Sequence, residues 1–275
     1  MKLVADSGST KTDWYLVKNQ SLVRHTTQGY NPYYWTTEEM KKSLELELLD
    51  NLQANEVQEL YFYGAGCSNP LNQDVIFEAL APTFSNAEIS LGDDLLAAAR
   101  STAGHEAGIC CILGTGSNSC VYDGQKIIDK IPSLGYILGD EGAGAYIGRQ
   151  LIRAYFYREL PPHLAKELEL SYNMDKHLII SELLNGKTPN RTLASFALFC
   201  AKQQEEPFIK KLIENNFEEF LHRHVLKYAN ATELPIHFVG SIAFGFRKNL
   251  IEVLERHHLT AGNIFKSPFP SLLAY

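Results

Sequence analysis

A small polar turn occurs twice in this chain, each time between two short apolar runs, and it is the feature that most constrains the fold. The first turn, DSGSTKT, lies between apolar segments at 2–5 and 13–17, and the second, LGTGSNS, lies inside the run 108–124. Small residues let backbone N–H groups approach an anion, and the hydroxyl groups add donors. A single turn of this kind is usually only a hairpin turn. Two of them, each opening one half of the chain, indicate a polyphosphate held from both sides.

Each half continues with alternating strand and helix patterns. In the first half the patterns predict strands at 2–5, 13–17, 21–26, 60–63 and 87–92, and helices at 37–52, 73–82 and 94–104. In the second half they predict strands within 108–124 and at 126–129, 234–240 and 262–267, helices at 142–158 and 244–258, and inserted helices at 163–184, 192–203 and 207–229. This alternation predicts an α/β fold with a largely parallel sheet in each half. We therefore predict two domains, 1–104 and 105–275, with a ligand cleft between them.

Composition excludes several classes of protein. The net charge of −7 argues against a nucleic-acid binder, which needs a basic face. No apolar run approaches the roughly 18 residues of a membrane span, and the N-terminus lacks a signal-peptide core. The five cysteines show no CxxC spacing, which predicts reduced core thiols and a cytoplasmic protein. Among the nine histidines there is no HExxH pattern, and His257 and His258 are expected to complement a helix dipole.

Charged residues accompany the first turn. Asp6 could hold a hydrated Mg²⁺ beside phosphates, and Lys11 could pair with a phosphate as a point charge. The alternative is that Asp6 forms an Asx turn and that Lys11 is a solvated tip residue. The P-loop pattern GxxxxGK[ST] and the dinucleotide pattern GxGxxG are both absent.

Three further segments are candidates for a site. Asp93 and Asp94 follow the strand at 87–92, either as helix-capping acids or as a base for a substrate hydroxyl. The glycine-dense stretch around Asp140 indicates either backbone close to a ligand or small-residue packing before a helix. The aromatic loop GYNPYYW at 29–35 is either a wall for sugar stacking or a set of packed surface aromatics.

Taken in order, these motifs resemble the BadF/BadG/BcrA/BcrD ATPase family of the sugar kinase and actin-like ATPase superfamily, and within it the N-acetylglucosamine kinase branch. The resemblance runs from VADSGSTKTDWYLV through GYNPYYW, LGDDLLAAA, ILGTGSNS and LGYILGDEGAGAYIGRQ to FVGSIA, and so covers nearly the whole chain. It implies two ribonuclease-H-like domains with an interdomain cleft, and ATP and Mg²⁺ as cofactors. It also implies a kinase that phosphorylates an amino sugar, with N-acetylglucosamine and its 6-hydroxyl as the expected acceptor.

The resemblance also implies roles for particular residues. Asp94 matches the catalytic aspartate beside the accepting hydroxyl. The nucleotide-side residues are Asp6, which is near Mg²⁺ through water, together with Ser9, Thr10, Lys11, Thr115, Gly116, Gly240 and Ser241. The sugar-side residues are Asn31, Ser117, Asn118, Leu134, Gly135 and Asp140.

The sequence departs from the family pattern in places. Serines at positions 7 and 9 replace glycines of the first motif, and SLGYIL lacks the tryptophan and histidine of the animal enzymes. A second hypothesis is a sugar or nucleotide sensor, or an ATPase that acts on a protein partner. The combination of Asp6, Lys11, Asp94 and Asp140 favours catalysis. The expected partner is a small-molecule sugar, without nucleic acid or membrane, and the inserted helices could supply a homodimer interface.

Overall fold

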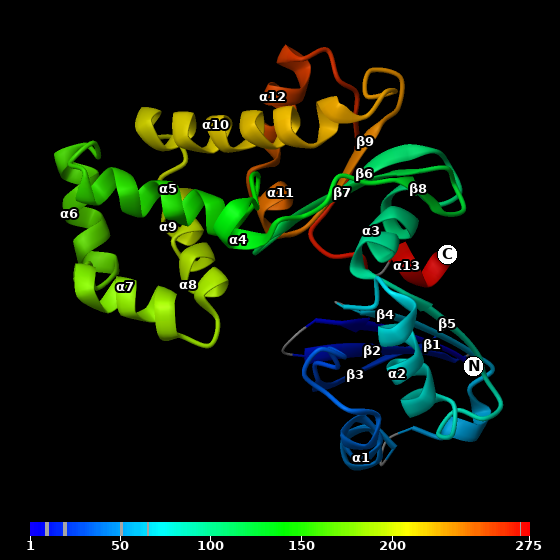
Figure 1. Cartoon of the computed structure of the whole chain (residues 1–275). Helices are drawn as coiled ribbons and strands as arrows, with labels where there is room; N and C mark the ends of the chain where they lie inside the picture. Colours follow the sequence, from blue (N-terminus) through cyan, green and yellow to red (C-terminus); the bar gives the residue numbers. More distant parts are fainter. Residues whose placement is uncertain (9–10, 19–20, 50–51, 65, 270) are drawn as a thin grey trace. The chain divides into compact units, whose positions relative to one another are not determined.

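The computed structural model describes residues 1–8, 11–18, 21–49, 52–64, 66–269 and 271–275 (Figure 1). Its contacts divide the chain into two compact units, Met1–Ala97 with Ser271–Tyr275, and Ala98–Pro270. We describe each unit by itself. The domain bounds 1–104 and 105–275 stay a prediction.

The first unit contains a five-stranded sheet with the order β3-β2-β1-β4-β5. Its strands are β1 (Lys2–Ser7), β2 (Lys11–Lys18), β3 (Ser21–Gln28), β4 (Glu59–Gly64) and β5 (Glu88–Gly92). The first three strands pair antiparallel, whereas β4 and β5 run parallel to β1. The sheet is therefore mixed, not largely parallel, because the opening hairpins contribute antiparallel pairs.

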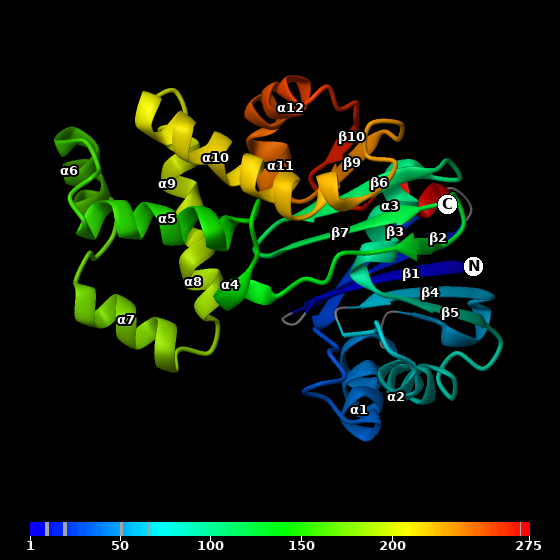
Figure 2. The same ribbon diagram turned by 45° about the horizontal axis from the view of Figure 1, so that its top comes forward.

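Two helices and a large aromatic core support this sheet. Helices α1 (Thr37–Glu47) and α2 (Pro70–Leu80) lie next to one another on one face (Figure 2). A capping box between Thr36 and Glu39 starts α1, as the sequence predicts. The fully buried Trp14 packs near Phe62, with their ring centroids 6.0 Å apart. Its indole N–H donates to Thr27 Oγ1 at 2.9 Å, so the only polar group of this large side chain is satisfied.

The second unit repeats this topology. Its sheet has the order β10-β9-β6-β7-β8, with β6 (Gly108–Leu113), β7 (Ser117–Tyr122), β8 (Ile127–Asp129), β9 (Ile236–Val239) and β10 (Ala261–Phe265). Strands β6 to β8 pair antiparallel, and β9 and β10 run parallel to β6. Each sheet thus places an opening pair of hairpins beside two parallel strands. The weak likeness between the two turns in the sequence therefore reflects a duplicated topology.

In the described part of the second unit, seven α-helices lie between β8 and β9, and two more follow β9. They are α4 (Gly135–Leu138), α5 (Gly144–Phe156), α6 (Pro162–Ser171), α7 (Lys176–Asn185), α8 (Pro189–Ser195), α9 (Ala197–Lys202), α10 (Pro207–Arg223), α11 (Ser241–Gly245) and α12 (Arg247–Arg256). A further helix, α3 (Asp94–Ala103), follows β5, and α13 (Ser271–Ala274) belongs to the first unit. The five cysteines are all buried and form no disulfide, as expected for core thiols.

Three of the inserted helices differ from the prediction. The segment predicted as one helix over 192–203 is divided at Phe196 into α8 and α9. The segment predicted as one helix over 163–184 is two helices, because the Asp175 side chain accepts the Leu178 N–H at 2.9 Å and starts a new helix. The helix predicted over 207–229 ends at Arg223, and a short 3₁₀ turn, Val225–Lys227, follows it. Among the residues that the structure describes, no helix is both long enough and apolar enough to cross a membrane.

Candidate active site

The first turn is held together by hydroxyl groups. The Gly8 N–H donates to the Lys11 carbonyl at 2.9 Å, which closes the turn between β1 and β2. The buried hydroxyls of Ser7 and Thr12 lie 2.7 Å apart across the hairpin, and the Tyr30 N–H donates to Ser7 Oγ at 3.0 Å. Ser7 therefore ties the start of the turn to the segment after β3.

Lys11 is positioned by an ion pair that the sequence reasoning missed. Its Nζ lies 2.6 Å from Asp13 Oδ2, and Arg24 donates to Asp13 Oδ1 at 2.9 Å. Partial burial would raise the pKa of Asp13, but the bonds from Lys11 and Arg24 outweigh it and hold that pKa below its usual value. Asp13 is thus ionised at neutral pH and keeps two cations beside the turn. Ser9 and Thr10, the other predicted nucleotide-side residues of this turn, lie outside the described residues.

Asp6 lies at the edge of the sheet where parallel strands end. In the strand register it pairs with Tyr63 of β4, and Tyr63 pairs with Gly92 of β5. Burial, with repulsion from Asp13, raises the pKa of Asp6 to about 6. A carboxylate that is partly stripped of water in this way is stabilised when a cation binds beside it. Ligands of open α/β sheets bind at this carboxyl edge of the strands.

The two acids after β5 have different roles in the structure. Asp93 Oδ1 accepts the Leu96 N–H at 2.9 Å, so the helix-capping interpretation applies to Asp93. Asp94 begins α3, and although the residue as a whole is exposed, protein atoms crowd around its carboxyl group. This crowding removes hydration and, with repulsion from Asp93, raises the pKa of Asp94 to about 6, and Asp6 contributes further repulsion. Asp6 and Asp94 are therefore close enough at this end of the sheet for the charge of Asp6 to raise the pKa of Asp94.

The aromatic loop divides into a buried and an exposed part. Tyr30 is buried and Trp35 packs edge-on against it, with ring centroids 5.6 Å apart. Tyr33 and Tyr34 are exposed, so only these two could stack on a ligand. Asn31 is buried between the two parts, and its Oδ1 accepts the Tyr33 N–H at 3.0 Å. The packing interpretation therefore applies to Tyr30 and Trp35, and a role of the exposed Tyr33 and Tyr34 in sugar stacking stays a prediction.

The second turn, between β6 and β7, is bonded to the start of α5. Within the turn, the Gly114 N–H donates to the Gly116 carbonyl at 3.0 Å. Two N–H groups at the start of the helix donate back to the turn, from Gly144 to the Gly114 carbonyl at 2.8 Å and from Ala145 to the Thr115 carbonyl at 3.1 Å. The turn and the glycine-dense segment are therefore one hydrogen-bonded unit.

Asp140 joins the same unit. It is a buried residue with a φ of 60°, and its Oδ1 accepts the Ser117 N–H at 3.1 Å. A Cβ added at Gly116 would lie 3.1 Å from the Asp140 carboxylate oxygens, so a larger residue would press on this carboxylate. Burial raises the pKa of Asp140, and the Ser117 N–H partly offsets this rise. Within the described part of the chain, the buried Ser117 Oγ has no hydrogen-bond partner, which makes it a donor and acceptor that a polar ligand could satisfy.

The loop before Asp140 is hydrogen-bonded to an arginine that the sequence reasoning missed. Gly135, with a φ of 68°, starts the short helix α4, and Leu134 before it is exposed. Arg149 of α5 donates to the Tyr136 carbonyl at 2.8 Å. The guanidinium thus satisfies the end of α4 and fixes the loop that carries the predicted sugar-side residues Leu134 and Gly135.

A second missed residue is Asn216 of α10. Its Oδ1 accepts the Gly142 N–H at 2.9 Å, in the segment that follows Asp140. Asn216 is buried and lies between Ile213 and Phe217 on the apolar side of the helix. A polar residue on an otherwise apolar helix face is a sequence signal that could have marked it.

Gly240 lies against the second turn. Its φ of 130° and ψ of 161° lie in a region that almost only glycine adopts, and a Cβ there would be 2.2 Å from the Leu113 carbonyl oxygen. Its N–H donates to the Phe265 carbonyl at 2.9 Å. Ser241 follows as the exposed first residue of α11. The predicted adenosine motif therefore packs directly on the last residue of β6, two residues before Thr115.

Comparison with solved structures decides the family. A candidate N-acetylglucosamine kinase from Porphyromonas gingivalis is 39% identical, covers 100% of this chain and 98% of its own, and superimposes with a TM-score of 0.93. The chain belongs to this family of N-acetylglucosamine kinase-like proteins. A candidate N-acetylglucosamine kinase from Chromobacterium violaceum is 21% identical, with a TM-score of 0.74 over 99% of this chain and 97% of its own. No protein-family model and no curated protein sequence matches.

More distant matches confirm the fold class. A ROK family glucokinase from Streptomyces griseus, solved with glucose and AMPPNP, is 13% identical and has a TM-score of 0.51 over 98% of this chain and 97% of its own. The two mixed five-stranded sheets match the ribonuclease-H-like, actin-like ATPase fold of sugar kinases, as the sequence predicts. The cleft between the two domains stays a prediction.

Proposed function

We propose that this N-acetylglucosamine kinase-like protein is an ATP-dependent kinase that phosphorylates N-acetylglucosamine at the 6-hydroxyl. The observation that carries the proposal is 39% identity over the whole chain to a candidate kinase for this sugar. The raised pKa values of Asp6 and Asp94 at one edge of a sheet support a site for charge and proton transfer. Assignment to the BadF/BadG/BcrA/BcrD family is part of the same proposal.

The two turns would bind the nucleotide. Mg²⁺ takes hard oxygen ligands and keeps several waters, and the partly desolvated Asp6 carboxylate fits such an ion. When bound, Mg²⁺ would neutralise charge on the phosphates. Beside it, Lys11 would neutralise further charge from the first turn. The remaining nucleotide-side residues would be Ser9 and Thr10 in the first turn, Thr115 and Gly116 in the second, and Gly240 and Ser241 against the adenosine.

Asp94 would act on the sugar. Phosphoryl transfer requires mainly positioning and charge stabilisation, so a carboxylate that orients the hydroxyl and accepts its proton late is sufficient. Asn31 would contact the sugar. The unsatisfied Ser117 Oγ and the carboxylate of Asp140 would hold sugar hydroxyls. Asn118, Leu134 and Gly135 complete the proposed sugar side.

The rate of sugar-dependent ADP release should rise as pH rises through about 6, because Asp94 accepts a proton only when it is ionised and its pKa is about 6. The free energy of unfolding should change in the opposite direction and fall as pH rises. The raised pKa of the Asp94 carboxyl contributes stability that is fully present below its unfolded-state pKa of 3.8 and is lost as pH rises through about 6. A kcat profile between pH 5 and pH 8 at saturating substrates tests this expectation. A flat profile would contradict it.

A coupled assay for ADP release tests the proposal itself. ATP and Mg²⁺ would be supplied with N-acetylglucosamine, glucosamine, N-acetylmuramic acid, N-acetylmannosamine, glucose or no sugar. Release that requires one of these sugars supports the kinase. ADP release that is independent of sugar and depends on an added protein would instead support the sensor or partner-driven ATPase. The cytoplasmic location and a homodimer through the inserted helices remain proposals.

A further inference from the structure

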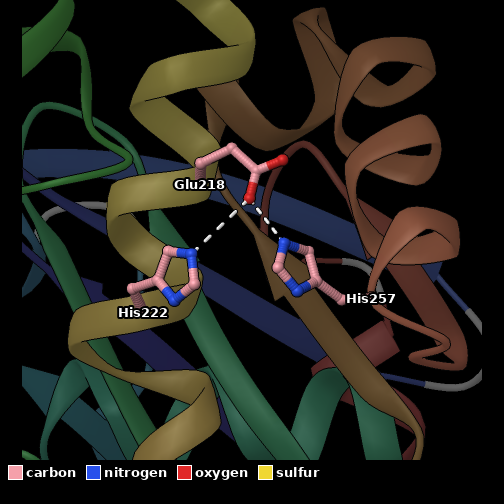
Figure 3. A group of neighbouring side chains, drawn as sticks. All are labelled: Glu218, His222 and His257. Carbon is pink, nitrogen blue, oxygen red and sulfur yellow. Dashed lines mark hydrogen bonds and ion pairs between the residues drawn. The ribbon is translucent and has the colours of Figure 1, made fainter.

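Three potential metal ligands meet at the outer side of the second unit. Glu218 and His222 lie one helical turn apart on α10, and His257 follows the end of α12. Figure 3 shows both imidazole rings turned toward the Glu218 carboxylate. His257 Nε2 lies 2.5 Å from Glu218 Oε2, and His222 Nε2 lies 3.9 Å from the same oxygen. One ligand atom from each residue lies within 4.8 Å of the other two.

We propose that Glu218, His222 and His257 form a Zn²⁺ site. Two imidazole nitrogens and one carboxylate oxygen are a donor set that suits Zn²⁺, with water as the fourth ligand. Tetrahedral Zn²⁺ at its usual bond lengths places ligand atoms about 3.3 Å apart. To reach this spacing, the distance from His257 Nε2 to Glu218 Oε2 would lengthen, and the distance from His222 Nε2 to the same oxygen would shorten, each by less than about 1 Å. The His222 side chain is 59% exposed, so it can make this adjustment without disturbing the core.

An arginine positions the carboxylate for this role. Arg256 donates from Nη2 to Glu218 Oε1 at 3.2 Å, so the other oxygen, Oε2, faces the two imidazoles. A second bond, from Arg256 Nη1 to Glu214 Oε2 at 3.1 Å, holds the guanidinium in place and balances its charge. Metal-binding carboxylates are commonly oriented by such outer partners. Arg256 is therefore a positioning residue of the proposed site.

The arrangement differs from an ordinary surface ion pair of histidine and glutamate. His163 and Glu206 form such a pair at 3.1 Å on another part of the same unit. Among the described residues, the single cluster of three ligating groups is the one around Glu218. The metal would join α10 to the end of α12, and α10 also carries Asn216, which accepts the Gly142 N–H of the candidate active site. The inference does not rest on the proposed kinase activity.

Titration of the chelator-treated full-length protein with Co²⁺, followed by displacement with Zn²⁺, tests the site. We expect one Co²⁺ per chain with the visible absorption of a tetrahedral complex, its loss when Zn²⁺ is added, and a higher Tm in the presence of Zn²⁺. His222→Ala, His257→Ala and Glu218→Gln should each weaken binding at least about 10-fold. Arg256→Gln should weaken it less, because Arg256 acts through Glu218.

His163→Ala is the matched control, since it removes an exposed histidine with a glutamate partner but without a third ligand. It should bind Co²⁺ as the unaltered chain does. Circular dichroism of each variant would establish that folding is retained, and His222→Ala is the decisive variant because its side chain is largely exposed. Absence of stoichiometric binding at micromolar metal would overturn the proposal. Equal binding by His222→Ala and the unaltered chain, or an equal loss in His163→Ala, would overturn it as well.

Discussion

Asp94→Asn is expected to lower kcat for sugar-dependent ADP release about 10²–10⁴-fold, which is the usual contribution of a general base. The substitution keeps the size of the side chain but removes its ability to accept a proton. Binding of ATP should be retained, because the first turn and Asp6 are unchanged. The variant should also be more stable than the unaltered chain at neutral pH, because the lost hydration of the crowded carboxyl and the repulsion from Asp93 and Asp6 raise the pKa of Asp94 to about 6 and so oppose its ionisation.

Asp93→Asn is the matched control for this experiment. It makes the same replacement, a carboxylate by an amide, at the neighbouring residue. An asparagine at position 93 can still accept the Leu96 N–H that Asp93 caps. Its kcat should therefore stay within a few-fold of the unaltered enzyme. If Asp93→Asn removed as much activity as Asp94→Asn, or if Asp94→Asn kept full activity, Asp94 would not be the base.

Gly240→Ala is expected to destabilise the second unit by about 3 kcal/mol or more. Backbone strain in this φ/ψ region costs about 1–3 kcal/mol for a residue with a side chain. The added methyl group would also lie 2.2 Å from the Leu113 carbonyl oxygen, so β6 and the second turn would have to move. Nucleotide affinity should fall with stability, because Thr115 and Gly116 lie only two and three residues after Leu113. Urea unfolding and titration with AMPPNP measure the two effects.

Gly245→Ala serves as the control for Gly240→Ala. Gly245 ends the same short helix α11, and a Cβ there would meet no atom within 4 Å. Replacing a helical glycine by alanine at such a site typically stabilises a protein by about 0.4–1 kcal/mol. A loss of stability in Gly245→Ala similar to that in Gly240→Ala would mean that the helix is sensitive to any substitution and that the contact with Leu113 is not the cause.

Local patterns were sufficient to predict most of the fold. Alternating apolar runs placed the strands, and the Thr36–Glu39 capping box placed the start of α1. The single helix predicted over 163–184 was wrong because its apolar spacing continues through a segment in which Asp175 caps a new helix. An aspartate at that position is a helix-start signal, so the break could have been predicted from the sequence.

The site was predicted only in its local parts. Asp13 lies two residues after Lys11 in a strand, so their shared face follows from the period of a strand, and this pair could have been anticipated. The bond between Asn216 and the Gly142 N–H joins residues 74 positions apart. It depends on how α10 packs beside the second turn, which the periodicity of the sequence does not predict. The contact between His257 and Glu218 of α10 could not be predicted for the same reason.

Identification of the phosphorylated product tests the proposed function most directly. The protein would be incubated with ATP, Mg²⁺ and N-acetylglucosamine, and the product would be analysed by ¹H–³¹P correlation NMR, with Asp94→Asn as the parallel sample. We predict a phosphate coupled to the protons of carbon 6, formed in equal amount to ADP and missing with Asp94→Asn. ADP without any phosphorylated sugar, or a product that Asp94→Asn forms equally fast, would contradict the proposal that this chain transfers phosphate from ATP to the sugar with Asp94 as its base.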